Sequence, residues 1–251
     1  MPALLPREPM ASPLQGQCID QVSFKIAENR DERSAAFRLV YHAYIRAGLI
    51  EPNPAGLRVT PYQLQPSCDI FIASLREEVI STVSLVADGP RGLPMESIYA
   101  GEISRLRESG LQFGEVSALA DRRRHLSRTL PVFVRMMRLM VQNAHRKGLD
   151  RLLVAVHPRH ARFYQRFLSF KPLAEERSYP LVCNHPAVAL YLDFAEIHRD
   201  RPPNFELFFG DRLPDEQVLP RPMPASDAEY FAEAALFGAR FAVLGPDASD
   251  A

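Results

Sequence analysis

The sequence has no excess of charge of either sign. Its 251 residues include 30 lysines and arginines and 30 aspartates and glutamates, so the formal net charge at pH 7 is +0. A balanced charge gives no general support for a nucleic-acid or anionic-membrane partner, and we expect no nucleic-acid partner. The chain also lacks an uninterrupted apolar run long enough to span a bilayer, so we expect no stable membrane insertion.

Cysteine is scarce. The three cysteines, Cys18, Cys68 and Cys183, lie far apart and form no C-x-x-C pair. This spacing argues against a zinc cluster or a disulfide framework and is typical of a reducing compartment. The N-terminal segment MPALLPREPM lacks the basic segment and apolar core of a secretory signal. We therefore expect a cytoplasmic protein with no bound metal.

The chain divides into three regions. Residues 1–20 are rich in proline and lack periodicity, which predicts a flexible N-terminal tail. Residues 21–195 contain the strand and helix patterns of one domain. Residues 196–251 form a C-terminal extension that is proline-rich at first, and DAEYFAEAALFGARF predicts one amphipathic helix in it.

The apolar pattern predicts the order β-α-β-β-α-β-α-β-α-β-β for residues 21–195. VSFKIA alternates as a half-buried strand does, whereas RLLVAV is a continuous apolar run, typical of a strand buried on both faces. Asn29, with Glu32 three residues later, predicts the N-terminus of the first helix. FGEVSALA and RLLVAV are separated by one long helix, so they should be parallel strands joined by a right-handed crossover. The predicted fold class is α/β, a mixed sheet with helices on both faces.

The long helix between these two strands has a distinctive surface. Ser127 or Thr129 is its predicted N-cap, and Gly148 marks its end. Most of its other side chains are apolar, so most of its circumference must be covered by other parts of the protein. Its narrow polar stripe consists of Arg135, Arg138, Gln142 and Arg146.

Polar residues gather where the two parallel strands end. Ligands of open α/β sheets bind beyond the carboxyl ends of strands, at the place where neighbouring strands part. One strand end here carries Ser117, Asp121 and the run Arg122–Arg124, and the other carries His157 and His160. The sequence therefore predicts a ligand site between these two strand ends.

This order of elements, with VSALA before a long helix and HPRHARFY after the next strand, resembles the GNAT acyltransferase superfamily. The segments AFRLVYHAYIRAGLI, STVSLV, GLPMESIY, GEVSALA and VHPRHARFY look closer to the long-chain N-acyl amino acid synthases, relatives of the acyl-homoserine lactone synthases. The likeness covers about Phe24 to Leu192. It implies a GNAT fold whose central mixed sheet is splayed between two parallel strands. It also implies an N-acyltransferase in which the amino group of an amino acid attacks a fatty acyl thioester.

The resemblance leaves two donors, acyl-CoA and an acyl group on acyl carrier protein, and implies no permanently bound cofactor. Relatives that use coenzyme A usually have a glycine-rich loop after the fourth strand, because glycine lets backbone N–H groups approach the pyrophosphate. Here no glycine lies between Glu115 and Gly148. Arginines suit a single pantetheine phosphate and an acidic carrier surface, so we predict acyl carrier protein as the partner. The predicted donor-binding residues are Arg122, Arg123, Arg124, Ser127 and Arg128.

Amide formation requires a base for the ammonium group of the acceptor. Glu115 is the candidate base, because partial burial at the head of an apolar strand would raise its pKa toward neutrality. The alternative is that Glu115 forms a structural ion pair with Arg105 or Arg107. Tyr164 is placed by the resemblance near the donor sulfur, where it would protonate the thiolate, and alternatively it is an aromatic core residue.

The remaining candidate residues bind the substrates. The resemblance places an oxyanion site at the backbone N–H groups of Ser117, Ala118 and Leu119. The amino acid carboxylate requires a cation, for which Arg58 is the first candidate and Arg105 the second, although either also suits an ordinary salt bridge. His157 and His160 are expected to line the site or to cap the following helix. They lack a third ligand in the local sequence, so zinc is not expected.

Two other functions fit the same motifs. The first is an autoinducer synthase of the acyl-homoserine lactone type, or another amine acyltransferase. The second is a catalytically silent GNAT-like module that binds acylated carrier protein. The basic run Arg122–Arg124 alone is too small an electrostatic footprint to favour nucleic-acid binding.

Overall fold

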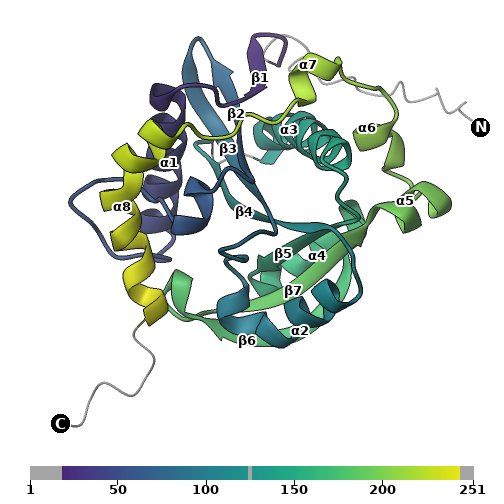
Figure 1. Ribbon diagram of the computed structural model, residues 1–251. Coiled ribbons are helices and arrows are strands. Elements are labelled where there is room, and N and C mark those ends of the chain that lie inside the picture. Colours follow the sequence, from purple (N-terminus) through teal and green to yellow (C-terminus); the bar gives the residue numbers. More distant parts are fainter. Residues whose placement is uncertain (1–18, 124–125, 244–251) are drawn as a thin grey trace, which may run out of the picture.

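The computed structural model describes residues 19–123 and 126–243, so nearly all of the predicted N-terminal tail lies outside the described residues. Seven strands form one mixed sheet in the order β1-β2-β3-β4-β5-β7-β6, with helices on both faces (Figure 1). The predicted order of strands and helices within the domain is confirmed. The strands are β1 (Val22–Ile26), β2 (Cys68–Leu75), β3 (Glu78–Ala87), β4 (Phe113–Asp121), β5 (Arg151–Val156), β6 (Lys171–Tyr179) and β7 (His185–Asp193).

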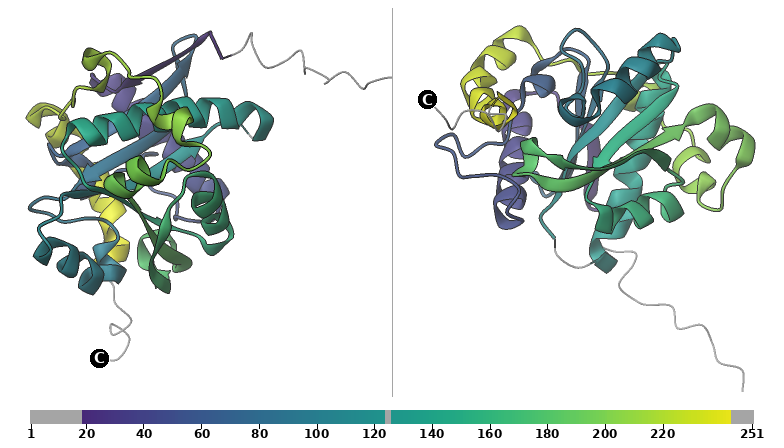
Figure 2. Two further views of the ribbon diagram at one scale, coloured as in Figure 1. Left: turned by 90° about the vertical axis from the view of Figure 1, so that its right-hand side faces the viewer. Right: turned by 90° about the horizontal axis from the view of Figure 1, so that it is seen from below.

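The helices divide between the two faces of the sheet (Figure 2). One face is covered by α1 and α2 and the other by α3 and α4. These helices are α1 (Arg30–Arg46), α2 (Glu96–Glu108), α3 (Leu126–Arg146) and α4 (Pro158–Phe167), and two 3₁₀ helices, η1 (Pro61–Leu64) and η2 (Pro180–Val182), lie in loops. No helix in the described residues is both long and apolar enough to cross a membrane.

The continuous apolar strands are explained by this two-sided cover. In β2, Ile70 and Ile72 point into the core beneath α1, while Phe71 and Ala73 point into the core beneath α3. A strand buried on both faces must be apolar at successive positions rather than at alternate ones. The predicted hairpin between β2 and β3 is confirmed, and its pairing ends with Leu75 opposite Glu78.

The C-terminal extension differs from the single predicted helix. The described residues after β7 contain α5 (Phe194–Asp200), α6 (Phe205–Phe209), α7 (Asp215–Val218) and α8 (Ala225–Val243). The sequence pattern missed α5 to α7 because each spans at most 7 residues, or about two turns, too few for a periodicity to appear.

The short helices of the extension pack along the polar stripe of α3. Arg138 Nε donates to Leu207 O at 2.8 Å, and Gln142 Nε2 donates to the carbonyl of Asp211 at 2.8 Å. The extension thus supplies hydrogen-bond partners for side chains that the sequence pattern assigned to the polar side of the helix. Packing of α6 and α7 on α3 completes the cover of this long apolar helix.

The predicted N-cap of α3 is wrong. The helix begins at Leu126, so Ser127 and Thr129 lie within its first turn rather than in front of it. The chain turns earlier than predicted, because Asp121 at the end of β4 accepts a hydrogen bond from the backbone N–H of Arg123 at 2.8 Å. Such an Asx turn ends the strand without help from a serine or threonine.

Gly114 lies in β4 at a point of close packing between elements. A Cβ atom at this position would lie 3.0 Å from the carbonyl oxygen of Val86 and 3.1 Å from a methyl group of Leu149. We predict that Gly114→Ala destabilises the protein by about 1–3 kcal/mol through overpacking. Gly101→Ala is the matched control, because nothing lies within 4 Å of its new methyl group. In the exposed part of α2 this change should stabilise by about 0.5–1 kcal/mol. Urea denaturation checks both values, and destabilisation by both variants would contradict the packing argument.

Candidate active site

The strands β4 and β5 pair over a short distance and then separate. Residues Phe113–Glu115 pair in parallel with Arg151–Leu153, and the pairing ends there. Beyond that point β4 remains paired with β3, as at Ser117, while β5 remains paired with β7, as at Val154. The fork begins directly after Glu115, as the predicted splayed sheet requires.

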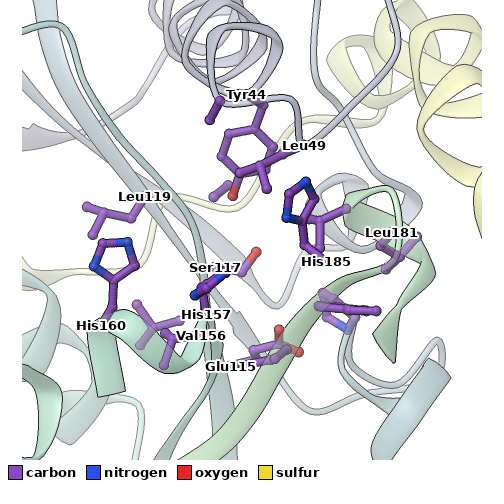
Figure 3. Close-up of a pocket in the computed structure, with 18 of the residues that line it drawn as sticks. Tyr44, Leu49, Glu115, Ser117, Leu119, Val156, His157, His160, Leu181 and His185 are labelled. Carbon is purple, nitrogen blue, oxygen red and sulfur yellow. The ribbon is translucent and has the colours of Figure 1, made fainter. Parts of the chain in front are cut away.

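A cavity of about 690 Å³ lies at the fork. Figure 3 shows Leu119 and His160 on one side of it and Leu181 and His185 on the other, with Glu115 below. The cavity brings together most of the residues predicted from the sequence. Those that line it are Arg58, Glu115, Ser117, Ala118, Leu119, His157, His160 and Tyr164.

Glu115 is buried at the apex of the fork, with 2% of its surface exposed. Its Oε2 accepts a hydrogen bond from the backbone N–H of Met95 at 2.8 Å. Burial raises the pKa of the Glu115 carboxyl to about 8, with Glu96 adding to the effect and the Met95 N–H opposing it. A carboxyl group that titrates near neutral pH inside a cavity is suited to proton transfer.

The structural alternative for Glu115 is wrong. Arg107 donates to both carboxylate oxygens of Asp88, at 2.8 and 2.6 Å, and not to Glu115. Arg105 lies near Glu102 on α2 with 74% of its side chain exposed, and it does not line the cavity. Arg105 is therefore also corrected as a candidate for the amino acid carboxylate, because it lies on the side of α2 that faces solvent.

A β-bulge shapes β4 just beyond Glu115. Ala118 and Leu119 together stand opposite Val83 of β3, between the paired residues Ser117 and Ala120. Ala118 has a φ of 51°, a left-handed conformation that is strained for a residue with a side chain. Because β5 no longer pairs with this part of β4, the bulge borders the cavity, and the oxyanion site at its N–H groups stays a prediction.

The helix α4 begins at the end of β5 and forms another wall. His157 is its N-cap, and its Nδ1 accepts a hydrogen bond from the backbone N–H of Arg159 at 3.2 Å. His160 Nε2 accepts a hydrogen bond from Arg159 Nε at 3.1 Å, and burial lowers its pKa. His157 thus combines the two predicted roles, since it both caps the helix and lines the cavity.

Tyr164, on the same helix, belongs both to the cavity and to an aromatic cluster. Its ring centroid lies 5.6 Å from that of Phe170 and 6.0 Å from that of Phe163, in edge-to-face contacts. Burial raises the pKa of its hydroxyl, and the neighbouring Tyr44 raises it further. A tyrosine with a raised pKa keeps its proton at neutral pH and can donate it to a stronger base.

Arg58 places a cation in the cavity wall. Only 7% of its surface is exposed, and its Nη2 donates to the carbonyl of Leu181 at 2.9 Å. Burial lowers the pKa of its guanidinium, whereas Tyr44 and Tyr179 raise it. A buried guanidinium is geometrically suited to a carboxylate ligand.

Sequence reasoning missed several residues of the cavity. Tyr44 lies in α1, and Gln63, Tyr179 and His185 lie in segments that carry no motif. Nε2 of His185 lies 3.2 Å from the carbonyl oxygen of Gly48. These residues come from separate parts of the chain, so only the fold brings them to the cavity. The described residues contain no cluster of three His, Cys, Asp or Glu side chains that could hold a metal ion.

The two predicted donor-binding arginines whose side chains the structure describes already have counter-ions. Arg122 forms an ion pair with Glu78, and Arg123 binds both carboxylate oxygens of Asp121. Neither arginine lines the cavity, and their assignment to the donor stays a prediction. Arg124 lies outside the described residues, as do the side chains of Ser127 and Arg128.

Comparison with known proteins identifies the family of the chain. The family described as N-acyl amino acid synthase FeeM matches residues 35–193, which is most of the chain. Among solved structures, FeeM, an N-acyl amino acid synthase from uncultured soil microbes, is 27% identical, with a TM-score of 0.61 over 73% of this chain and 96% of that chain. None of the curated proteins compared with this chain matches it.

Two further solved structures are similar at lower identity. The AHL synthase LasI is 12% identical, with a TM-score of 0.55 over 77% of this chain and 96% of that chain. An N-acetyltransferase from Staphylococcus aureus Mu50 is 14% identical, with a TM-score of 0.45 over 68% of this chain and 97% of that chain. With the FeeM match, the predicted resemblance and the predicted acyltransferase fold are confirmed.

The raised pKa of Glu115 makes the stability of the protein depend on pH. The folded-state pKa of about 8 lies above the ordinary value of 4.5, so the folded protein binds this proton more tightly than the unfolded chain does. The resulting stabilisation is fully present below about pH 4.5 and is lost as the pH rises to about 8.

We predict that the free energy of unfolding of the wild type falls by several kcal/mol, relative to that of Glu115→Gln, as the pH rises from about 5 to about 8.5. Each unit of pKa shift corresponds to about 1.4 kcal/mol. Glutamine has the same shape, accepts the same hydrogen bond and does not ionise. Urea denaturation of both proteins at both pH values gives the difference, from which other titrating groups cancel. A difference that does not change with pH would contradict the raised pKa.

Proposed function

Because the chain belongs to the N-acyl amino acid synthase FeeM family and is an N-acyltransferase, we propose that it joins a long-chain fatty acyl group to the amino group of an amino acid, with acyl carrier protein as the donor. The fork between β4 and β5 carries this proposal, because it places a buried Glu115 beside a cavity that can admit a thioester. An amine near Glu115 and an acyl carbonyl beside the bulge at Ala118 lie within the same site.

The chemistry begins with a proton transfer to Glu115. The pKa of about 8 for its carboxyl lies much nearer to that of an amino acid's ammonium than the pKa of an ordinary carboxyl does, so the acceptor can give up its proton to Glu115 at a reduced cost. The free amine then attacks the thioester carbonyl and forms the C–N bond. Backbone N–H groups near Ala118 hold the oxyanion until the C–S bond breaks. As the C–S bond breaks, Tyr164 gives its proton to the sulfur and takes up the second proton of the attacking nitrogen, so a neutral amide and a free thiol leave, and Glu115 releases its proton to solvent.

The two ends of the cavity differ in chemistry, which supports two different substrates. Arg58 and Glu115 offer one cationic and one acidic group, and an amino acid carries a carboxylate and an ammonium. The side of the cavity that carries Leu119 (Figure 3) is mostly apolar apart from Arg159 and His160 of α4, and it can bury a fatty chain. Its apolar lining residues include Leu119, Leu130, Phe133, Val156 and Phe163.

Helix α4 supports a carrier protein as the donor. Arg159, Arg162 and Arg166 are exposed on α4, and none of them forms an ion pair with another described residue. Phe163 lies among them with 37% of its surface exposed, and the same helix lines the cavity. A carrier protein is acidic, so these three arginines would attract it electrostatically and hold its pantetheine arm at the cavity entrance. The arginines of α4 therefore complement the sequence-based assignment to Arg122 and Arg123.

We predict that Glu115→Gln lowers kcat/KM for acyl transfer by about 100-fold or more, the usual loss when a general base is removed. The wild-type rate should rise with pH through about 8 as the carboxylate forms, and this rise should be absent in the variant. The assay supplies acyl carrier protein loaded with a long-chain acyl group and each of the common amino acids, and mass spectrometry identifies the products. Glu108→Gln, at an exposed position of α2, is the control and should behave as the wild type.

Three outcomes of this assay would contradict parts of the proposal. An unchanged rate and pH profile for Glu115→Gln would show that the assigned base is wrong. Lactones formed from S-adenosylmethionine would favour the autoinducer synthase. If the wild type acylates no amino acid and yet binds the loaded carrier protein, the silent binding module is the better description.

The carrier surface has its own test. We predict that the double variant Arg162→Glu and Arg166→Glu raises KM for the acyl carrier protein donor by about tenfold or more, because it repels an acidic partner. KM for the same acyl group on free pantetheine should not change. Arg199→Glu with Arg212→Glu is the control of equal charge change, at exposed sites in the extension. An equal loss with both donors, or with both double variants, would contradict docking at α4.

A further inference from the structure

The helix α8 lies outside the part of the chain that matches the family, since that match ends at residue 193. It runs beside α1 (Figure 1) and packs against both 3₁₀ helices, η1 and η2. Both of these short helices contribute to the cavity, η1 through Gln63 and η2 through Leu181 and Val182. The extension is therefore in contact with two of the elements that form the cavity wall.

A buried ion pair fixes the start of α8 to α1. Arg33 Nη1 lies 2.8 Å from Asp227 Oδ2, and Arg33 and Asp227 are 2% and 7% exposed. Arg30 Nε adds a second contact to the same carboxylate, at 3.0 Å. Two further donors of Arg33, on Nη1 and Nη2, bind the carbonyls of Glu28 and Ala27. A buried pair supported by these hydrogen bonds favours one position for the helix.

Residues within α8 are connected to Arg58 through contacts with one residue of α1. Phe231, which is fully buried, packs edge-to-face on Phe37 of α1, with ring centroids 5.0 Å apart. The backbone carbonyl of the same Phe37 accepts a hydrogen bond from the backbone N–H of Arg58 at 3.1 Å. Phe231 also shares its core with Val59, the next residue along the chain.

The guanidinium of Arg58 is bound by η2, which is also in contact with α8. Its Nη2 donates to the carbonyl of Leu181 in η2, against which α8 packs. The helix thus supports both the backbone and the side-chain end of Arg58. A shift of α8 would move both supports together.

We propose that α8 is a positioning element for the amino acid end of the cavity, with Phe231 and Asp227 as the residues that act through Arg58. That the ligand at this end is an amino acid rests on the proposed function, whereas the positioning of Arg58 by α8 does not. The extension then sets the affinity for the acceptor, and the acyl donor binds independently of it.

The two halves of the extension provide a matched comparison. Phe205 in α6 is 5% exposed and packs on the other face of the sheet, in the core that contains α3. Phe231→Ala and Phe205→Ala remove the same buried ring from the same extension, so both should lower the melting temperature. Their effects on the cavity should differ, because α6 supports none of the residues that hold Arg58.

We expect Phe231→Ala to raise KM about tenfold for the amino acid that the wild type acylates fastest, with kcat and the donor KM within about twofold. Phe205→Ala should leave all three constants within about twofold of the wild type. Equal changes in both variants, or an unchanged amino acid KM for Phe231→Ala, would overturn the proposal.

Hydrogen exchange gives a second readout that does not depend on activity. In Asp227→Asn, which keeps the shape of the side chain and removes its charge, amides of residues 58–65 and 180–184 should exchange faster, while those of β4 and β5 stay unchanged. Faster exchange confined to α8 and α1 would overturn the proposal. If the wild type acylates no amino acid, the proposed function fails, but the exchange pattern still decides whether α8 positions Arg58.

Discussion

The structure depends on a carboxyl group buried where two parallel strands cease to pair. Glu115 is held by the backbone N–H of Met95 rather than by Arg105 or Arg107, so burial is not offset by a neighbouring cation from that helix. Its pKa of about 8 follows from that placement. A group placed this way costs stability at high pH, and such a cost is typical of residues that take part in chemistry.

The fork is stable because each strand that leaves it keeps another partner. β4 continues along β3 and β5 along β7, so both strands remain hydrogen-bonded on their outer edges. The bulge at Ala118 bends β4 further, and α4 starts at the end of β5. The gap is therefore part of the fold rather than a defect in it, and its walls come from elements on both faces of the sheet.

The sequence predicted what depends on local pattern. The order of strands and helices and the choice of Glu115 follow from apolar periodicity and from one acidic residue at the head of an apolar strand, whereas the fork was implied by the family resemblance. It could not predict that Glu78, on a strand more distant in sequence, would neutralise Arg122, or that Arg105 would face solvent. These contacts depend on how helices and strands pack in the tertiary structure. The position of His185 in the cavity wall depends on the same packing. The short helices α5 to α7 were missed because two turns or fewer leave no periodic signature.

The most direct measurement is a crystal structure with a non-hydrolysable analogue of an acyl-pantetheine thioester bound together with an amino acid. The account predicts that the acyl carbonyl lies in the fork, within hydrogen-bond distance of backbone N–H groups between Ser117 and Leu119. The amino nitrogen should lie beside the Glu115 carboxyl, directly or through one water. An analogue bound outside the cavity, or β4 and β5 paired beyond Glu115 in the complex, would contradict the account.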